Sequence, residues 1–159
     1  MNPWLDFYHK KVKITTAGYL AKLIKNFIFM LKEAKKIHFI GIGGIGISTI
    51  AQILKEQGKE ITGSDIEDTE HIQQLKSEGL RIAIGHDAKN LEDDTDLVIY
   101  SFAIEKDNPE LIKAKELNIP CITYPQSVGE FSKDYYTIAI TGTHGKSTTT
   151  SMTALLLLK

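Results

Sequence analysis

The chain has 159 residues, of which 42% are hydrophobic and 25% charged, as is usual for one ordinary soluble domain with an appendage. Its formal net charge of -1 excludes the strongly basic composition typical of nucleic-acid-binding proteins. The single cysteine, Cys121, excludes a disulfide framework and a cysteine-based metal cluster. It lies in the apolar run IPCITY, which is typical of a buried small hydrophobic residue, and it favours a reducing, cytoplasmic location.

The first 36 residues differ from the rest in charge. They contain eight lysines and two acidic residues, whereas the remaining 123 contain eleven Lys and Arg and eighteen acidic residues. Apolar residues between 20 and 31 recur at helical spacing, which predicts an amphipathic helix in a basic N-terminal extension, residues 1–35. Lysines interrupt the apolar run, so a transmembrane span is not favoured. A cleaved signal peptide is not favoured either, because the run is short and no small-residue cleavage site follows it. We expect this helix to dock on the domain or a partner chain, with weak attachment to a membrane surface as the alternative.

From residue 36 onward, apolar runs of strand length alternate with helical stretches. The predicted strands span residues 37–41, 60–65, 81–85, 96–101, 120–124 and 136–141. The predicted helices span residues 45–57, 68–78, 108–117 and 126–132. This alternation is typical of an α/β fold in which crossover helices connect the strands of a parallel sheet. We therefore predict a Rossmann-like domain over residues 36–133, followed by a polar link near residue 134.

The first predicted strand leads into the glycine pattern GIGGIG. Gly41, Gly43 and Gly46 have the spacing G-x-G-x-x-G between a strand and a helix, where free N–H groups at the helix N-terminus can meet a diphosphate. Asp65 follows Gly41 by 24 residues, at the end of the second predicted strand, where an acid can reach a ribose. The pattern predicts a phosphate-binding turn, with a merely structural tight turn as the alternative. It is compatible with NAD and equally with other nucleotides that carry a diphosphate.

Residues 134–159 contain a second phosphate-binding pattern, TGTHGKST. Its G-K-[ST] core supplies Lys146 to bind phosphate oxygens and Ser147 to bind magnesium. The backbone N–H groups from Gly142 to Ser147 can surround phosphates. Ile140 occupies the first glycine position of the usual pattern, which indicates a variant P-loop. Because a predicted strand precedes the loop and a helix follows it, we expect the first strand, P-loop and helix of an incomplete ATP-binding domain.

The chain resembles the Mur ligases of bacterial cell-wall synthesis from about residue 36 to its end. The ATP loop of that family has the form G-T-x-G-K-[ST]. The resemblance rests on the stretches HFIGIGGIGIS, GSD, GHDAKNL, SFAIEKDNPEL, NIPCITYPQSVGEF and IAITGTHGKSTTTSM. Within the family, GIGGIG favours the branch that adds L-alanine to UDP-N-acetylmuramate.

The resemblance implies two sets of site residues. In that family the Rossmann-like domain binds the UDP part of UDP-N-acetylmuramate, which implies a substrate site formed by Gly43, Gly44, Ile45, Gly46, Asp65, His86, Ser101 and Ala103. The second loop implies an ATP site formed by Gly142, Thr143, His144, Gly145, Lys146, Ser147 and Thr148. Lys146 would be catalytic and Ser147 would bind magnesium.

Three features of the stretches quoted above also have simpler interpretations. His86 is equally compatible with an exposed turn histidine that has no role. Asn108 and Pro109 favour a helix start over a ligand contact, and His144 favours a loop position whose backbone binds phosphate. Phe102 stands where the family usually has a small residue, so the uridine pocket is expected to differ in detail.

The resemblance implies an ATP-dependent, amide-forming ligase of peptidoglycan synthesis that works through an acyl phosphate, with ATP and Mg²⁺ as cofactors. Such ligases continue beyond the P-loop helix, so we expect this 159-residue chain to bind UDP-N-acetylmuramate without ligating it. L-alanine is expected as a partner only in a full-length ligase, and no nucleic-acid partner is expected. Two alternatives remain open: an NAD-binding Rossmann regulatory module, which leaves GTHGKST unexplained, and a non-catalytic product of a broken ligase gene.

Overall fold

The computed structural model describes residues 31–158 of the chain. Most of the predicted N-terminal helix therefore lies outside the described residues. Its last turn is seen at residues 31–33, which are helical, and Leu31 and the following Ala34 are buried in the main core. This end of the predicted extension is thus packed against the α/β domain.

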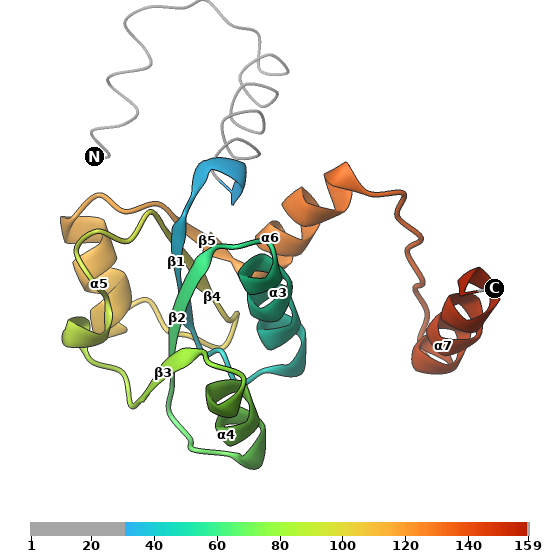
Figure 1. The fold of residues 1–159 in the computed structure, drawn as a ribbon, viewed down its shortest axis with the longest axis horizontal. Coiled ribbons are helices and arrows are strands. Elements are labelled where there is room, and N and C mark those ends of the chain that lie inside the picture. The colour runs from blue at the N-terminus through green and yellow to red at the C-terminus, as the bar shows by residue number, and fades with distance from the viewer. Residues whose placement is uncertain (1–30, 159) are drawn as a thin grey trace, which may run out of the picture.

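Five parallel strands form one sheet, in the order β3-β2-β1-β4-β5 (Figure 1). The strands are β1 (Lys36–Ile40), β2 (Glu60–Asp65), β3 (Arg81–Ile84), β4 (Leu97–Tyr100) and β5 (Cys121–Thr123). Every residue of β1 is buried, as expected for the central strand of a parallel sheet that is covered on both faces. The predicted Rossmann-like α/β fold is confirmed, and each of these strands lies within one or two residues of its predicted position.

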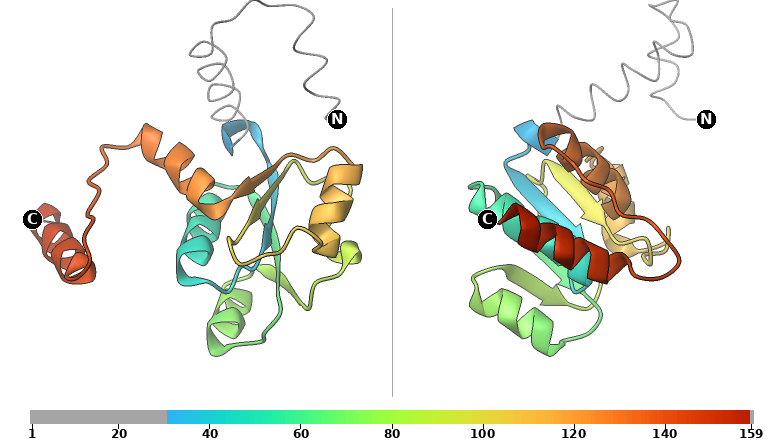
Figure 2. Two further views of the ribbon diagram at one scale, coloured as in Figure 1. Left: turned by 180° about the vertical axis from the view of Figure 1, so that it is seen from behind. Right: turned by 90° about the vertical axis from the view of Figure 1, so that its right-hand side faces the viewer.

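Helices cover both faces of the sheet, and each face has its own apolar core. The helices are α3 (Ile45–Glu56), α4 (Glu70–Ser77), α5 (Pro109–Glu116), α6 (Tyr124–Phe131) and α7 (Lys146–Leu157), with short 3-10 turns η1 (Ala88–Asn90) and η2 (Ser132–Asp134). Side chains of α3, α4 and α6 pack in one cluster, and those of α5 pack in the other. Figures 1 and 2 show α5 on the face of the sheet opposite α3 and α4.

Local capping explains where these helices begin. Thr69 accepts a hydrogen bond from the Ile72 amide at the start of α4, and Asn108 caps α5, as predicted from its sequence. Helix α6 begins at Tyr124, two residues earlier than predicted, because Thr123 and Gln126 form a capping box there.

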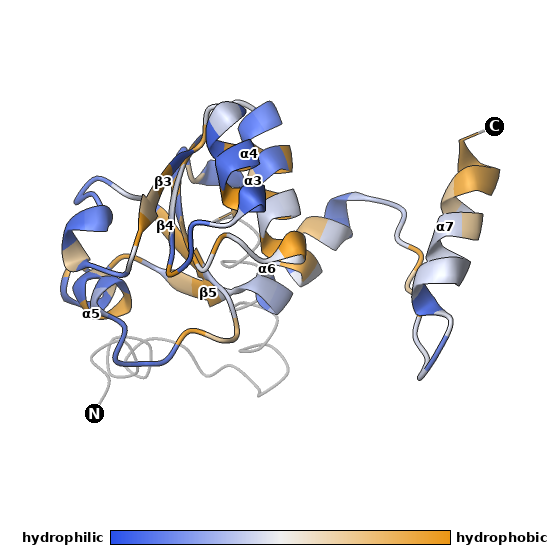
Figure 3. Ribbon diagram, turned by 90° about the horizontal axis from the view of Figure 1, so that it is seen from below, coloured by the Kyte–Doolittle hydropathy of each residue, from blue (hydrophilic) through white to orange (hydrophobic). Residues whose placement is uncertain are grey.

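The segment after α6 differs from the prediction. Residues 136–141 were expected to form a strand, but they do not. No strand among residues 31–158 lies beside them to form backbone hydrogen bonds with them. This segment leads to α7, which stands apart from the sheet (Figures 1 and 2). The C-terminal part of α7 is hydrophobic (Figure 3), and its Leu155, Leu156 and Leu157 are exposed.

No helix within residues 31–158 combines the length and the apolar character needed to cross a bilayer.

Candidate functional site

A cavity of about 580 Å³ lies at the carboxyl ends of the central strands. Strands β2 and β3 lie on one side of β1, whereas β4 and β5 lie on its other side. The strand order therefore reverses at β1, next to the cavity. Open α/β sheets bind their ligands at such a point. The cavity is lined by Gly41, Gly44, Asp65, Ile66, His86, Ser101, Ala103, Ile104, Glu105, Asp107, Asn108 and Pro109. Five of the eight predicted substrate residues are therefore brought together in one cavity.

The first phosphate loop is held to the end of β2 by backbone hydrogen bonds. The amides of Gly41 and Ile42 both donate to the carbonyl oxygen of Ser64, at 2.8 and 3.1 Å. Gly41 has φ of +75°, and a Cβ at this position would lie 3.0 Å from the Cβ of Ser101. Only glycine meets both requirements without strain, so the loop conformation is specified by its first glycine.

Asp65 fixes the next part of the loop. Its Oδ2 accepts a hydrogen bond from the Gly43 amide at 2.7 Å, and its side chain also lines the cavity. The residue predicted to bind the diphosphate, Gly43, and the residue predicted to bind the ribose, Asp65, are therefore hydrogen-bonded to each other. In this structure the Gly43 amide is already satisfied by protein.

The N-terminus of α3 faces the loop without a side-chain cap. Gly44 is the N-cap residue and supplies no capping side chain, so the first amides of this helix lack a side-chain acceptor. Ile45 is 83% exposed. A Cβ at Gly46 would collide with the Tyr124 hydroxyl, so a larger residue here would displace the Tyr124 side chain of α6. Gly43, Ile45 and Gly46 do not themselves line the cavity.

His86 is a cavity residue with defined partners. Its Nδ1 lies 3.2 Å from Oγ of Ser64 and 3.3 Å from Oε1 of Glu110, and its side chain is 18% exposed. His86 is therefore half-buried and hydrogen-bonded rather than exposed, and its role in binding stays a prediction.

Ser101 and Ala103 reach the cavity from the turn that follows β4. The Ser101 amide donates to the carbonyl oxygen of Ile40 at 2.9 Å, and the Ile104 amide donates to the carbonyl oxygen of Ser101 at 3.0 Å. The neighbouring Phe102 is 84% exposed. Ser101 and Ala103 thus line the cavity, whereas Phe102 between them faces solvent.

Sequence reasoning missed several wall residues. Ile66 directly follows β2, while Ile104, Glu105 and Asp107 follow β4. Their position just after the carboxyl ends of predicted strands was the available signal, because ligands of such sheets lie there. Asn108 both caps α5, as predicted, and lines the cavity.

The second phosphate loop is formed by local contacts. The Lys146 ammonium donates to the carbonyl oxygens of Gly142 and Thr143, at 2.6 and 3.2 Å. Gly145 is the N-cap of α7 and has φ of +76°. All seven residues of the predicted ATP site, 142–148, are exposed. The structure gathers them in one loop and does not bring them to the cavity.

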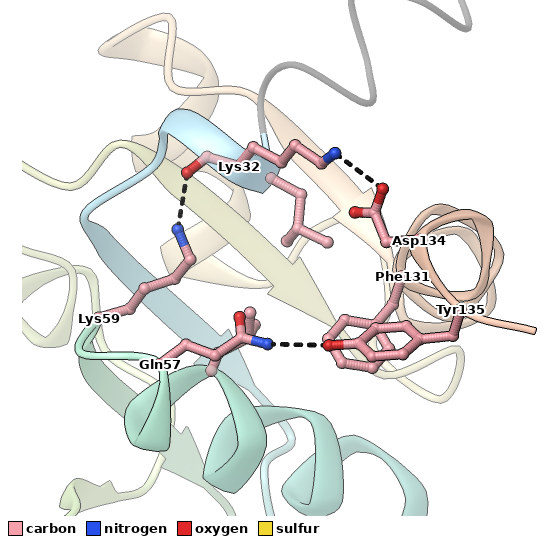
Figure 4. A pocket seen from close by; sticks show the side chains of 8 residues that line it. Lys32, Gln57, Lys59, Phe131, Asp134 and Tyr135 are labelled. Carbon is pink, nitrogen blue, oxygen red and sulfur yellow. Dashed lines mark hydrogen bonds and ion pairs between the residues drawn. The ribbon is translucent and has the colours of Figure 1, made fainter.

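A second hollow, of about 350 Å³, lies near the amino ends of β1 and β2 (Figure 4). Its polar groups bond to one another: Lys32 pairs with Asp134 at 2.7 Å, and the Lys59 ammonium donates to the carbonyl oxygens of Lys32 and Ala34. Burial lowers the pKa of Lys59. Because these groups are already paired, this hollow offers little to a charged ligand.

Within the part of the chain that the structure describes, no cluster of three or more His, Cys, Asp or Glu side chains could hold a metal ion. A magnesium ion at Ser147 would therefore need oxygen ligands from a nucleotide in addition to the hydroxyl.

Curated relatives share about half of the aligned residues. The chain is 48% identical over 126 residues to the UDP-N-acetylmuramate–L-alanine ligase of Clostridium kluyveri and 50% identical over 130 residues to that of Aquifex aeolicus. These alignments cover 79% and 81% of this chain and 28% of each relative. The matched region is thus little more than a quarter of the length of these relatives.

Solved structures of related ligases have a similar fold. The UDP-N-acetylmuramate–alanine ligase of Thermotoga maritima matches with a TM-score of 0.60 and 38% identity, over 62% of this chain and 23% of that one. A murein peptide ligase of Psychrobacter arcticus matches with a TM-score of 0.72 and 30% identity, over 77% of this chain and 26% of that one. The fold is therefore common to two kinds of ligase.

A family model described as "Mur ligase family, catalytic domain" matches residues 36–136, which is most of the chain. The matched region contains the sheet, the first phosphate loop and the cavity, and it ends before the second loop. This chain belongs to the Mur ligase family.

Proposed function

We propose that the chain is the substrate-binding portion of an ATP-dependent UDP-N-acetylmuramate–L-alanine ligase of peptidoglycan synthesis. The observation that carries this proposal is the cavity at the strand-order reversal, where Gly44, Asp65, His86, Ser101 and Ala103 meet from separate elements. The curated relatives named above support the choice of substrate. Family membership does not favour the NAD-binding regulatory module.

The diphosphate of the substrate would bind at the N-terminus of α3. The amide of Gly43 is already taken by Asp65, so the amides of Gly44, Ile45 and Gly46 are the ones assigned to phosphate oxygens. The helix dipole of α3 adds a favourable interaction with negative charge there.

The uridine would lie along the rest of the cavity wall. His86, Ser101 and Ala103 would surround it, and the second oxygen of Asp65 would face its ribose. Glu105 and Asp107 add negative charge to this wall, so they fit hydroxyl and N–H donors of the ligand and not its phosphates.

The second loop would hold ATP and Mg²⁺ through residues 142–148. Its exposed backbone and the Lys146 ammonium fit phosphate oxygens, and the Ser147 hydroxyl fits a magnesium ligand. When bound, ATP would supply phosphoryl transfer to the muramate carboxylate. Lys146 would neutralise negative charge on the transferred group, which is the catalytic role assigned to it. L-alanine would be the second substrate of the complete ligase, acting in the cytoplasm.

The domain boundaries predicted from sequence are retained as part of this proposal. Residues 36–133 would form the UDP-binding domain, 1–35 a basic extension, and 134–159 the start of the ATP-binding domain. Burial of Leu31 and Ala34 in the main core supports moving the first boundary a few residues earlier.

Calorimetric titration tests the substrate assignment. The chain should bind UDP-N-acetylmuramate, should bind UDP more weakly, and should show no heat with NAD⁺. Binding of NAD⁺ with no binding of UDP-N-acetylmuramate would contradict the proposal.

A further inference from the structure

The carboxylate of Glu110 is completely buried beneath the cavity. It lies in the first turn of α5, whose N-cap Asn108 accepts hydrogen bonds from the amides of Glu110 and Leu111. A negative charge is favoured at this end of a helix. Burial raises the pKa of the Glu110 carboxyl, but hydrogen bonds from His38 and Ser64 outweigh burial and hold that pKa below its ordinary value of 4.5. Glu110 is therefore a buried carboxylate.

One oxygen of this carboxylate is bound from the sheet. Oε2 of Glu110 lies 2.8 Å from Nε2 of His38 on β1 and 2.7 Å from the Ser64 hydroxyl on β2. The other ring nitrogen of His38 lies 2.8 Å from the Thr62 hydroxyl. These contacts link α5 to the two central strands.

The other oxygen is bound from the loop that carries His86. Oε1 of Glu110 lies 3.1 Å from Nδ2 of Asn90 and 3.3 Å from the amide of Asp87. It also lies 3.3 Å from Nδ1 of His86. Both oxygens are thus occupied by protein donors, and Glu110 reaches the cavity only through its partners.

The protons in this network can be assigned from its chemistry. An ionised carboxylate only accepts hydrogen bonds, and the single proton of the Ser64 hydroxyl points to Oε2 of Glu110. Oγ of Ser64 can then only accept from Nδ1 of His86, 3.2 Å away. Both neighbours of Nδ1 are therefore acceptors, so Nδ1 carries the proton.

We propose that Glu110 is a positioning residue of the substrate site, which together with Ser64 keeps the proton of neutral His86 on Nδ1 and presents Nε2 to the cavity as a hydrogen-bond acceptor. This inference rests on the proposed function of the cavity. Such an acceptor recognises an N–H or O–H group of the UDP moiety, either the imide of the uracil or a ribose hydroxyl. The His86 tautomer is thereby fixed by a residue that itself does not touch the ligand.

The tautomer of His86 can be measured without any ligand. Long-range ¹H–¹⁵N spectra of the labelled chain at about pH 8 show neutral imidazoles, and loss of a signal in His86→Ala assigns His86. Wild type should show the Nδ1–H form. Glu110→Gln should shift His86 toward the Nε2–H form, because an amide N–H in place of Oε1 donates toward Nδ1 of His86, which must then accept. An unchanged tautomer in Glu110→Gln, or the Nε2–H form in wild type, would overturn the proposal.

Thr62→Val is the matched control for a purely structural effect. It removes a hydroxyl at the far end of the same buried network, next to His38, and leaves both partners of His86 in place. It should lower the melting temperature without changing the His86 tautomer or the affinity for UDP-N-acetylmuramate. A tautomer change in Thr62→Val equal to that in Glu110→Gln would also overturn the proposal.

A double-mutant cycle tests whether Glu110 acts through His86. Glu110→Gln should weaken binding of UDP-N-acetylmuramate about tenfold in the wild-type background and less than about twofold in the His86→Ala background. Equal weakening in both backgrounds would contradict the proposal. If Glu110→Gln does not fold, Ser64→Ala takes its place in the cycle, with an expected weakening of about threefold.

The two proposals fail in different ways. If wild type shows the Nδ1–H form but no binding of UDP-N-acetylmuramate, the proposed function is wrong while the effect of Glu110 on His86 stands. If wild type binds the ligand but the cycle shows no coupling, the proposed function stands and Glu110 is structural only.

Discussion

The two glycine-rich loops of this chain contain glycines with almost the same φ but in different surroundings. Gly41 has φ of +75° and Gly145 has φ of +76°. A Cβ at Gly41 would meet side chains of the turn after β4, whereas a Cβ at Gly145 would meet nothing within 4 Å. Within residues 31–158, the first loop is thus held by distant parts of the chain and the second by its own residues.

This difference separates two ways of fixing the conformation of a glycine-rich loop. The second loop needs little beyond its own sequence, because Lys146 bonds to the carbonyl oxygens of Gly142 and Thr143 just before it. The first loop depends on β2 and on Asp65, so its geometry exists only in the folded sheet. The first loop is therefore the one whose ligand affinity and stability are coupled to the core.

Hydrogen exchange should show the largest contrast between the two regions. Every residue of β1 is buried, so its amides should exchange only through global opening. Helix α7 has no buried residue and, as a short helix without tertiary support, should open readily. We expect protection of β1 to exceed that of α7 by on the order of a thousandfold or more. Mass spectrometry or NMR measures this, and comparable protection in both regions would break the comparison.

Alanine at the two matched glycines should affect stability very differently. Gly41→Ala combines a left-handed backbone with crowding against Ser101 and Ile104, and should lower the free energy of unfolding by about 3 kcal/mol. Gly145→Ala has the same backbone cost but affects only the second loop, so the urea midpoint of the α/β domain should not change. A similar shift in both variants would show that the second loop is coupled to the core.

Thiol reactivity gives a third contrast. Burial raises the pKa of Cys121 to about 11 from an ordinary value of 9.0. The thiolate is the reactive form, so at about pH 8 native Cys121 should react with iodoacetamide about a hundredfold more slowly than an ordinary thiol, and its rate should keep rising with pH up to about 11. A cysteine introduced by Ser147→Cys, exposed at the start of α7, should react at the ordinary rate or faster. Equal rates at the two positions would contradict this interpretation.

Features encoded locally were predicted well from the sequence. The strands β1 to β5 are short apolar runs, and the cap at Asn108 and the loop GIGGIG have local patterns, so each was placed within one or two residues. The cavity was predicted in part, because Asp65 and Ser101 lie at the ends of recognisable strands.

Features that depend on distant partners were missed. Glu110 resembles an exposed acid in a first helical turn, and nothing local indicates that five donors from other elements surround it. The contact of Gly46 with Tyr124 joins residues far apart in the sequence. The strand predicted at 136–141 was wrong because an apolar run forms a strand only when another strand pairs with it.

Substitutions at Asp65 and Lys146 compare how much each loop contributes to the affinity for UDP-N-acetylmuramate. Asp65→Ala removes the acceptor for the Gly43 amide, 2.7 Å away, and should weaken binding of UDP-N-acetylmuramate about tenfold because the loop loses its support. Lys146→Ala should change that affinity by less than about twofold, since the second loop does not reach the cavity.

Asp65→Asn separates the effect of the Asp65 charge on the affinity for UDP-N-acetylmuramate from the effect of its hydrogen bond to the Gly43 amide. The aspartate charge also repels a diphosphate, so its removal favours binding while the lost acceptor opposes it. Asparagine removes the charge and keeps an oxygen that can accept from the Gly43 amide. Calorimetry should therefore rank the affinities with Asn at or above wild type and Ala below it. If Asn and Ala weaken binding equally, the charge of Asp65 contacts the ligand directly and its hydrogen bond to the loop is secondary.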